Sequence, residues 1–152
     1  MNESPENQDR NGTYFRFFNE LGIINQLAGT RAERFLPFGL TMSQFSVLNH
    51  FMRGLPPKSP LELAKAFQVT KGAMTNTVRQ LETKGFVDVR PHETDGRSKI
   101  VSISDEGRTA HQTAQHALAD AFSDFTDNFT MQEIGELLPA LEKVRIWLDE
   151  NR

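Results

Sequence analysis

The segment of residues 71–84 carries the side chains with the clearest chemical potential in this sequence. If it forms a helix with Met74, Val78 and Leu81 on its buried side, small and polar side chains lie on the opposite side. These outward residues are Gly72, Asn76, Arg79, Gln80 and Thr83, with Ala73 and Thr75 on the flanks. Asparagine, glutamine and arginine can form paired hydrogen bonds with base edges in the major groove of duplex DNA. Because any solvated helix face can carry these residue types, the helix alone does not establish DNA binding.

The start of the same helix could bind a phosphate group. Thr70 is expected to cap the helix, and Lys71 follows it directly. Unpaired backbone N–H groups and a lysine charge therefore lie together, which suits an anion such as a DNA phosphate. Gly72 and Ala73 are small enough to permit a close approach of the DNA.

A polar loop after this helix adds a second basic element. It contains Asp95 and Arg97 on either side of Gly96, a residue that permits a sharp turn. Asp95 could hold Arg97 extended through a charge-assisted hydrogen bond, and an extended arginine fits the narrow minor groove of A·T-rich DNA. Ser98 and Lys99 could reach adjacent phosphates. The alternative is a surface ion pair of little energetic value, but the helix and the loop together favour DNA binding.

The charge distribution supports the same interpretation. The chain has a net charge of −3, yet residues 65–99 carry seven basic and four acidic side chains, and the remainder has a net charge of −6. A basic face on an acidic body orients a protein on a polyanion.

The rest of the sequence predicts a mainly α-helical fold with one small β-hairpin. A first amphipathic helix is expected over roughly residues 13–35, and two strands over residues 86–90 and 99–103. Residues able to cap a helix predict five further helix starts, at Thr41, Ser59, Thr70, Ser104 and Thr130. The residues expected to face inward after Ser59 are Leu61, Ala64 and Phe67. Pro139 is expected to kink the last helix.

Aromatic side chains cluster near both ends of the sequence. The first group is Phe15, Phe17 and Phe18, and the second is Phe122, Phe125 and Phe129, with Ile146, Trp147 and Leu148 further along. One lobe could not cover so many apolar side chains, and large apolar patches usually mark an interface. We therefore expect a homodimer rather than a monomer.

The sequence resembles the MarR family, the multiple-antibiotic-resistance type of transcriptional regulator, in five segments. These are residues 40–45, 61–64, 70–87, 95–99 and 104–108. The resemblance covers nearly the whole chain after residue 12 and implies a winged helix-turn-helix fold, with a homodimer on a pseudo-palindromic DNA operator. It would make residues 71–84 the recognition helix and Arg97 the arginine of the wing. Many members also bind a small aromatic effector that releases the DNA, for which the candidate residues are Phe15, Phe18, Phe38 and Phe45.

These expectations divide the chain into four parts. They are a flexible tail (residues 1–12), a dimerisation helix (13–38), a winged helix-turn-helix DNA-binding domain (39–104) and dimerisation helices (105–152). The expected function is that of a sequence-specific regulator, a repressor, which a small aromatic effector could release from its operator. The alternatives are a winged-helix protein-interaction module, and a ligand- or metal-sensing protein without strong DNA specificity.

The composition argues against several other classes of protein. There is no cysteine, which excludes disulfides, thiolate metal sites and cysteine nucleophiles and fits a reducing cytoplasm. No apolar run reaches the ~20 residues that cross a bilayer, and residues 1–12 lack the apolar centre of a signal peptide. The four histidines are not spaced as a metal site, and the common hydrolase and phosphate-binding motifs are absent. We therefore expect a cytoplasmic protein that needs no cofactor or metal, does not contact membranes and is not an enzyme.

Overall fold

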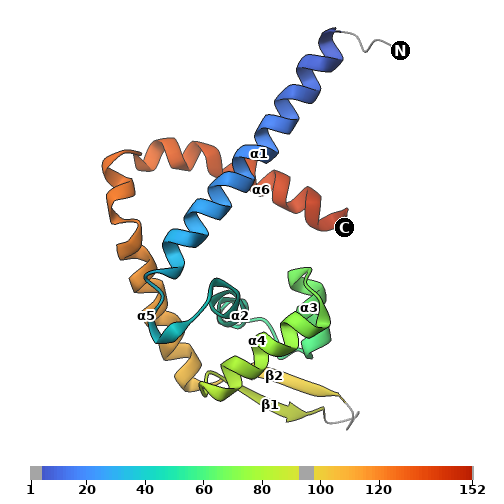
Figure 1. Ribbon diagram of the computed structural model, residues 1–152, viewed down its shortest axis with the longest axis vertical. Helices are drawn as coiled ribbons and strands as arrows, with labels where there is room; N and C mark the ends of the chain where they lie inside the picture. The colour runs from blue at the N-terminus through green and yellow to red at the C-terminus, as the bar shows by residue number, and fades with distance from the viewer. Residues whose placement is uncertain (1–4, 93–97, 152) are drawn as a thin grey trace.

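The computed structural model describes residues 5–92 and 98–151. Its helices are α1 (Pro5–Glu33), α2 (Met42–Met52), α3 (Pro60–Phe67), α4 (Lys71–Thr83), α5 (Asp105–Ala121) and α6 (Met131–Glu150), with 3-10 turns η1 (Pro37–Gly39) and η2 (Ser123–Asp127). The strands are β1 (Val87–Pro91) and β2 (Lys99–Ile103). Helices α2, α3 and α4 and the hairpin form one lobe, and α1 and α6 lie beyond it (Figure 1). The predicted mainly α fold with one small hairpin is confirmed for the described residues.

The predicted caps at Thr41, Ser59, Thr70, Ser104 and Thr130 are all present. Each hydroxyl oxygen accepts a hydrogen bond from the backbone N–H three residues later. Three of these residues, Thr41, Ser59 and Thr130, also form complete capping boxes, in which the later side chain bonds back to the cap's N–H. These local bonds satisfy backbone donors that a helix start leaves unpaired, and they fix where each helix begins.

The core of the lobe fixes the orientation of α4. Met74, Val78 and Leu81 are buried, as predicted, and Leu81 is fully inaccessible together with Leu48 of α2. Burying such a side chain contributes about 1.5–3 kcal/mol. Because the apolar side of α4 is held in this way, its polar side must face outward.

The prediction that Leu61 faces inward is wrong. Leu61 is 47% exposed, whereas Leu63 and Ala64 are buried. Positions two apart on a helix point about 200° from each other, so α3 can bury only one of the two leucines. The lobe takes the side of α3 that carries Leu63 and Ala64.

The hairpin pairs β1 with β2 in an antiparallel register, from Val87 opposite Ile103 to Pro91 opposite Lys99. The first strand therefore begins one residue later than predicted. Lys58 joins β2 from the other side, because its N–H and carbonyl exchange hydrogen bonds with those of Val101. This extra pairing attaches the hairpin to the segment before α3.

The first helix begins earlier than predicted. Residues 5–12, which were expected to be a flexible tail, form the first turns of α1. Helix α5 ends at Ala121, and Phe125 lies in η2. Helix α6 runs from Met131 to Glu150 with Pro139 inside it, so the kink expected at Pro139 would bend this helix without ending it.

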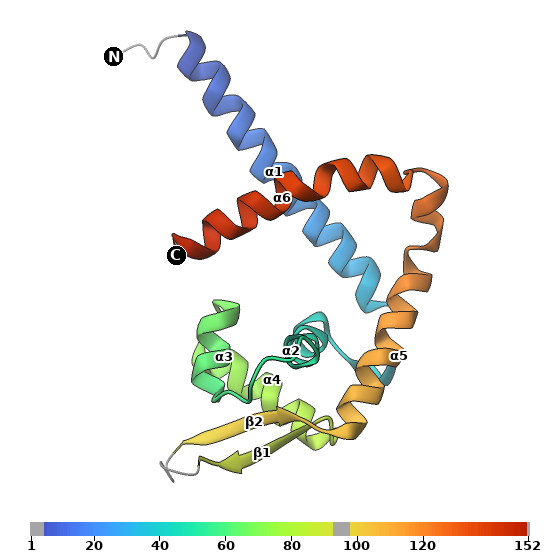
Figure 2. The ribbon, with the colours of Figure 1, turned by 180° about the vertical axis from the view of Figure 1, so that it is seen from behind.

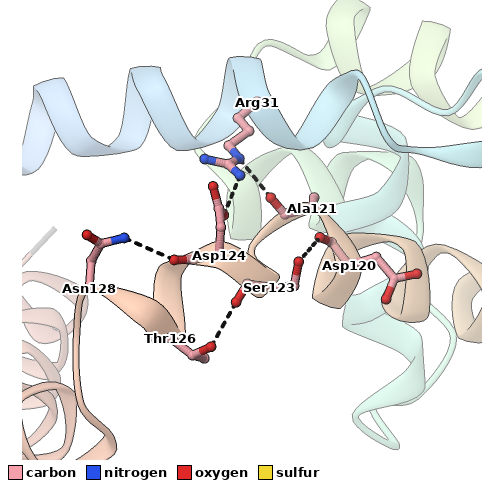
Figure 3. Close-up of polar contacts among 7 residues, drawn as sticks. All are labelled: Arg31, Asp120, Ala121, Ser123, Asp124, Thr126 and Asn128. Carbon is pink, nitrogen blue, oxygen red and sulfur yellow. Dashed lines mark hydrogen bonds and ion pairs between the residues drawn. The ribbon is translucent and has the colours of Figure 1, made fainter.

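Arg31 joins the end of α1 to the end of α5 (Figure 3). Its Nε donates to the carbonyl oxygen of Ala121 at 2.7 Å, and its Nη2 donates to Oδ1 of Asp124 at 2.5 Å. The guanidinium carbon also lies 5.5 Å from the centre of the Phe122 ring. Ala121 is the last residue of α5, so its carbonyl oxygen has no N–H donor within the helix. Arg31 supplies that donor. The same contact holds the pKa of Asp124 below its usual value.

Gly107 lets α5 pack closely against the start of β1. A Cβ atom at this position would lie 2.0 Å from the carbonyl oxygen of Phe86 and 3.0 Å from Cγ1 of Ile103. Next to it, Ser104 donates from its hydroxyl to the carbonyl of Gly85 at 2.6 Å and from its N–H to that of Phe86 at 3.2 Å. This joint connects the lobe to the helices beyond it.

We predict that Gly107→Ala lowers the free energy of unfolding by about 3 kcal/mol, because the obstructing atoms belong to the backbone and cannot rotate away. The measurement is urea denaturation followed by circular dichroism. Gly72→Ala is the matched control, since a Cβ at Gly72 has no neighbour within 4 Å. Equal stability of the two variants would contradict the role of Gly107 in this joint.

His111 of α5 is a buried titratable group beneath α2. Its ring stacks on Phe45 with centroids 5.1 Å apart, and its Nε2 lies 3.0 Å from Oδ1 of Asn49. Burial lowers the pKa of His111 below its ordinary 6.5. The pKa of His50 is lowered as well, by burial and by the charges of Lys58 and Arg53.

Because the folded pKa of His111 is depressed, the unfolded chain binds more protons just below pH 6.5, and the folded state loses stability as the pH falls through that range. We predict that His111→Gln, which keeps a polar side chain but removes the titration, weakens this loss. Urea denaturation at about pH 7.5 and about pH 5.5 measures the difference. An unchanged pH dependence in the variant would contradict a depressed pKa at His111.

Candidate nucleic-acid interface

Helices α3 and α4 form a helix-turn-helix. Gln68 ends α3 in the left-handed conformation with φ of 52°, and Thr70 then caps α4 through a hydrogen bond from the N–H of Ala73 at 3.2 Å. The short turn lets the two helices cross while α4 packs into the lobe. The cap leaves Lys71 at the exposed start of α4.

The outward residues predicted on α4 are all exposed. They are Gly72, Ala73, Thr75, Asn76, Arg79, Gln80 and Thr83, and Lys71 at the start of the helix is exposed as well. Five of them line one open groove along the helix: Lys71, Gly72, Thr75, Asn76 and Arg79. The structure therefore brings the predicted helix residues together on one surface.

Two side chains on this surface already hold each other in a defined orientation. Nη2 of Arg79 donates to Oδ1 of Asn76 at 2.9 Å. The pair lies one helical turn apart, so the guanidinium is drawn along the helix toward the amide. Both groups keep further N–H donors for an external partner.

The far end of α4 is tied to α2 and to the 3-10 turn η1 that precedes it. Nε2 of Gln44 donates to Oε1 of Gln80 at 2.5 Å, and Nζ of Lys84 donates to the carbonyl oxygen of Phe38 at 2.7 Å. Neither contact was predicted from the sequence. A signal was present, because Gln44 lies on the same helical stripe as the buried Val47, Leu48 and Phe51 of α2.

The hairpin carries the remaining predicted residues. Lys99 is exposed and Ser98 is half-buried, and the carbonyl of Ser98 accepts a hydrogen bond from the N–H of His92 at 2.8 Å. Asp95 and Arg97 lie outside the described residues. Their predicted role in a minor groove therefore stays a prediction.

The four phenylalanines considered for an effector site lie in different places. Phe45 is half-buried and stacks on His111, and Phe38 packs edge-on against Phe86. Phe15 and Phe18 are 74% and 49% exposed on α1, which leads away from the lobe (Figure 1). Phe45 lies at the contact between α2 and α5, where it stacks on His111.

A second surface is apolar and consists of α1 and α6. Among the described residues, α6 has no buried side chain and α1 has only Ala32. The most exposed large apolar side chains on it are Tyr14, Phe15, Ile24, Leu27, Met131, Leu137 and Trp147. Leu21 of α1 and Leu138, Leu141 and Leu148 of α6 also line a common groove. Figure 2 shows α5 connecting this surface to the lobe that contains α2, α3, α4 and the hairpin.

The described residues give no indication of a metal site or a membrane segment. Across residues 5–92 and 98–151, no three histidine or acidic side chains gather as metal ligands. No helix in that part of the chain has the length and apolar character needed to span a bilayer.

Comparison with known proteins identifies relatives along most of the chain. A model of the MarR family matches residues 38–98. The multiple antibiotic resistance protein MarR of Escherichia coli K12 is 31% identical over 136 residues, which cover 84% of this chain and 94% of that protein. The transcriptional activatory protein BadR of Rhodopseudomonas palustris is 27% identical over 137 residues, covering 88% and 77%.

Solved structures show the same fold. Apo wild-type MarR from E. coli matches with a TM-score of 0.72 and 28% identity, covering 83% of this chain and 94% of that one. A cysteine-to-serine variant of that MarR, complexed with operator DNA, matches with a TM-score of 0.71 and 27% identity over 87% and 95% of the two chains. The regulator BldR of Sulfolobus solfataricus matches with a TM-score of 0.75 and 26% identity over 87% and 94%.

Proposed function

Because the chain belongs to the MarR family of winged-helix transcriptional regulators, we propose that it binds a pseudo-palindromic DNA operator as a homodimer. At the level of the family, its relatives are regulators rather than enzymes. The observation that carries the proposal is the polar side of α4, which is exposed over its whole length while the apolar side is locked into the lobe.

Helix α4 is the proposed recognition helix. A major groove about 12 Å wide admits one helix, and Arg79, Asn76 and Gln80 have the donors and acceptors that contact base edges. Lys71 and the free N–H groups at the start of α4 would contact phosphates and set the position of the helix. The MarR variant solved with operator DNA has this fold, which supports the assignment.

The hairpin is the proposed wing. Lys99 pairs with Pro91 at the outer end of the hairpin, and Ser98 directly precedes it. We assign both residues to phosphates beside the major groove. Asp95 and Arg97 follow from the sequence as the part that enters the minor groove, where an arginine favours narrow A·T-rich tracts.

The apolar surface of α1 and α6 supports a homodimer. Leaving many large apolar side chains in water is unfavourable by about 25 cal/mol for each Å² of apolar area, and a second copy of the chain can cover them. A two-fold dimer also presents two copies of α4, and dimers of this type read half-sites about one helical turn apart.

We propose repression as the mode of regulation, because a dimer bound across neighbouring half-sites excludes other proteins from that DNA. A small aromatic effector would release the DNA by changing the packing between the lobe and α5, where Phe45 lies against His111. In vitro transcription from a promoter that the protein binds tests whether the protein represses or activates. Increased transcription on adding the protein would show activation instead of repression.

We predict that Arg79→Ala weakens DNA binding at least about 5-fold, because the loss of a base-reading arginine costs about 1–3 kcal/mol. The measurement is a gel-shift titration on duplexes selected from a random library. Arg16→Ala is the matched control, since Arg16 is exposed and belongs to α1 rather than to α4. Equal affinity of the Arg79→Ala variant and the wild-type protein would contradict the proposed recognition helix.

We predict that Trp147→Asp shifts the protein from dimer to monomer and reduces DNA binding with it, because a charge at a covered apolar position opposes association. Sedimentation velocity gives the oligomeric state directly. Leu61→Asp is the control, because Leu61 is similarly exposed but belongs to α3 in the lobe. A Trp147→Asp variant that remains fully dimeric would exclude this surface as the interface.

A further inference from the structure

Three polar groups in series connect the start of α2 to the outer side of α4. The N–H of Thr41 donates to Oε1 of Gln44 at 3.3 Å, and Nε2 of Gln44 donates to Oε1 of Gln80 at 2.5 Å. Gln44 is only 3% exposed, whereas Gln80 is exposed. A buried amide therefore reaches out of the core and holds an amide on the DNA-facing surface.

The direction of this series follows from chemistry. A backbone N–H can only donate, so it determines that the oxygen of the Gln44 amide faces Thr41. The nitrogen of the same amide then faces Gln80, and because that nitrogen can also only donate, the oxygen of Gln80 must turn toward it. The two polar ends of an amide lie on opposite sides, which leaves the –NH₂ group of Gln80 facing away from α2.

From this geometry we propose that Gln44 is a positioning residue that makes Gln80 a hydrogen-bond donor toward DNA. Among the described residues, no acceptor is bonded to Nε2 of Gln80, so this group remains available. The inference rests on the proposed function of α4 as a recognition helix. It predicts which base Gln80 prefers, which the exposure of Gln80 alone does not determine.

The rule concerns which base Gln80 can contact. A freely rotating glutamine reads adenine with both ends of its amide, accepting from N6 and donating to N7. A glutamine whose oxygen is held by Gln44 offers its –NH₂ group instead. It therefore favours a base edge with acceptors, which guanine provides at N7 and O6 and which cytosine lacks in the major groove.

Gln44 is held firmly enough to impose this choice. It lies in the capping box of α2, where its own N–H donates to the hydroxyl of Thr41 at 3.2 Å. A side chain fixed at both its backbone and its oxygen, and enclosed by the lobe, has few other orientations. The exposed bond between Arg79 and Asn76 has no such buried support.

The test is selection of bound duplexes from a random library with the full-length protein and its variants. Gln80→Ala first identifies the base position that Gln80 reads, as the position at which preference is lost. We expect the wild-type protein to prefer guanine over cytosine there. Gln44→Met, which is nearly isosteric but cannot donate, should reduce that preference at least about 5-fold, equivalent to about 1 kcal/mol, and leave the other positions unchanged.

Gln44→Glu gives a second and opposite expectation. A glutamate retains the capping box but can only accept a hydrogen bond, so Gln80 must turn its –NH₂ group inward and its oxygen outward. The preference at the same base position should then move toward a base with an exposed amino group, cytosine or adenine. Thr41→Ala is the stability control, because it weakens the cap of α2 while its backbone N–H still orients Gln44.

The outcomes separate the two proposals. If the wild-type protein enriches no sequence, the proposed DNA-binding function fails, and this inference fails with it. If the wild-type protein enriches a motif that Gln80→Ala leaves unchanged, or that folded Gln44→Met and Gln44→Glu both leave unchanged, only the inference is overturned. Gln80 is on the surface, so Gln80→Ala still identifies the base position if the Gln44 variants do not fold. A wild-type preference for guanine at that position then supports the inference, and a preference for adenine or cytosine overturns it.

Discussion

The packing of the apolar side of α4 is the constraint on which the rest of the structure depends. Met74, Val78 and Leu81 pack into the lobe formed by α2, α3 and the hairpin, and this leaves only one orientation for the helix. The polar side then faces outward as a consequence of this burial and needs no contact of its own to do so. The bonds from Gln44 and Lys84 act on a helix that the core has already oriented, and they fix side chains rather than the helix itself.

The second requirement is a firm connection between this lobe and the helices beyond it. Gly107 and Ser104 hold the start of α5 against the turn between α4 and β1. At its other end, α5 is joined to α1 by Arg31, which bonds both the carbonyl of Ala121 and Asp124. Helix α5 is thus bound at both ends, to the lobe at its start and to α1 at its end.

The sequence predicted the features that depend on local signals. The cap at Thr41 and the apolar spacing of Met74 and Val78 each involve residues within one or two helical turns, and both are present. The missed contacts join distant residues: Gln44 and Gln80 are 36 positions apart, and Arg31 and Ala121 are 90 apart. Such pairs depend on how complete helices and strands pack against one another. The spacing of apolar residues along the sequence does not determine that packing. Leu61 was misplaced for a related reason, because α3 offers two apolar sides and only the surrounding lobe selects between them.

The central claim is that two copies of α4 enter the same face of one duplex. Hydroxyl-radical footprinting of the protein on a selected duplex tests this claim most directly. The account predicts two protected tracts on one face of the DNA, with centres about 10 base pairs or a multiple of that apart. A single protected tract, or two tracts on opposite faces of the duplex, would contradict it.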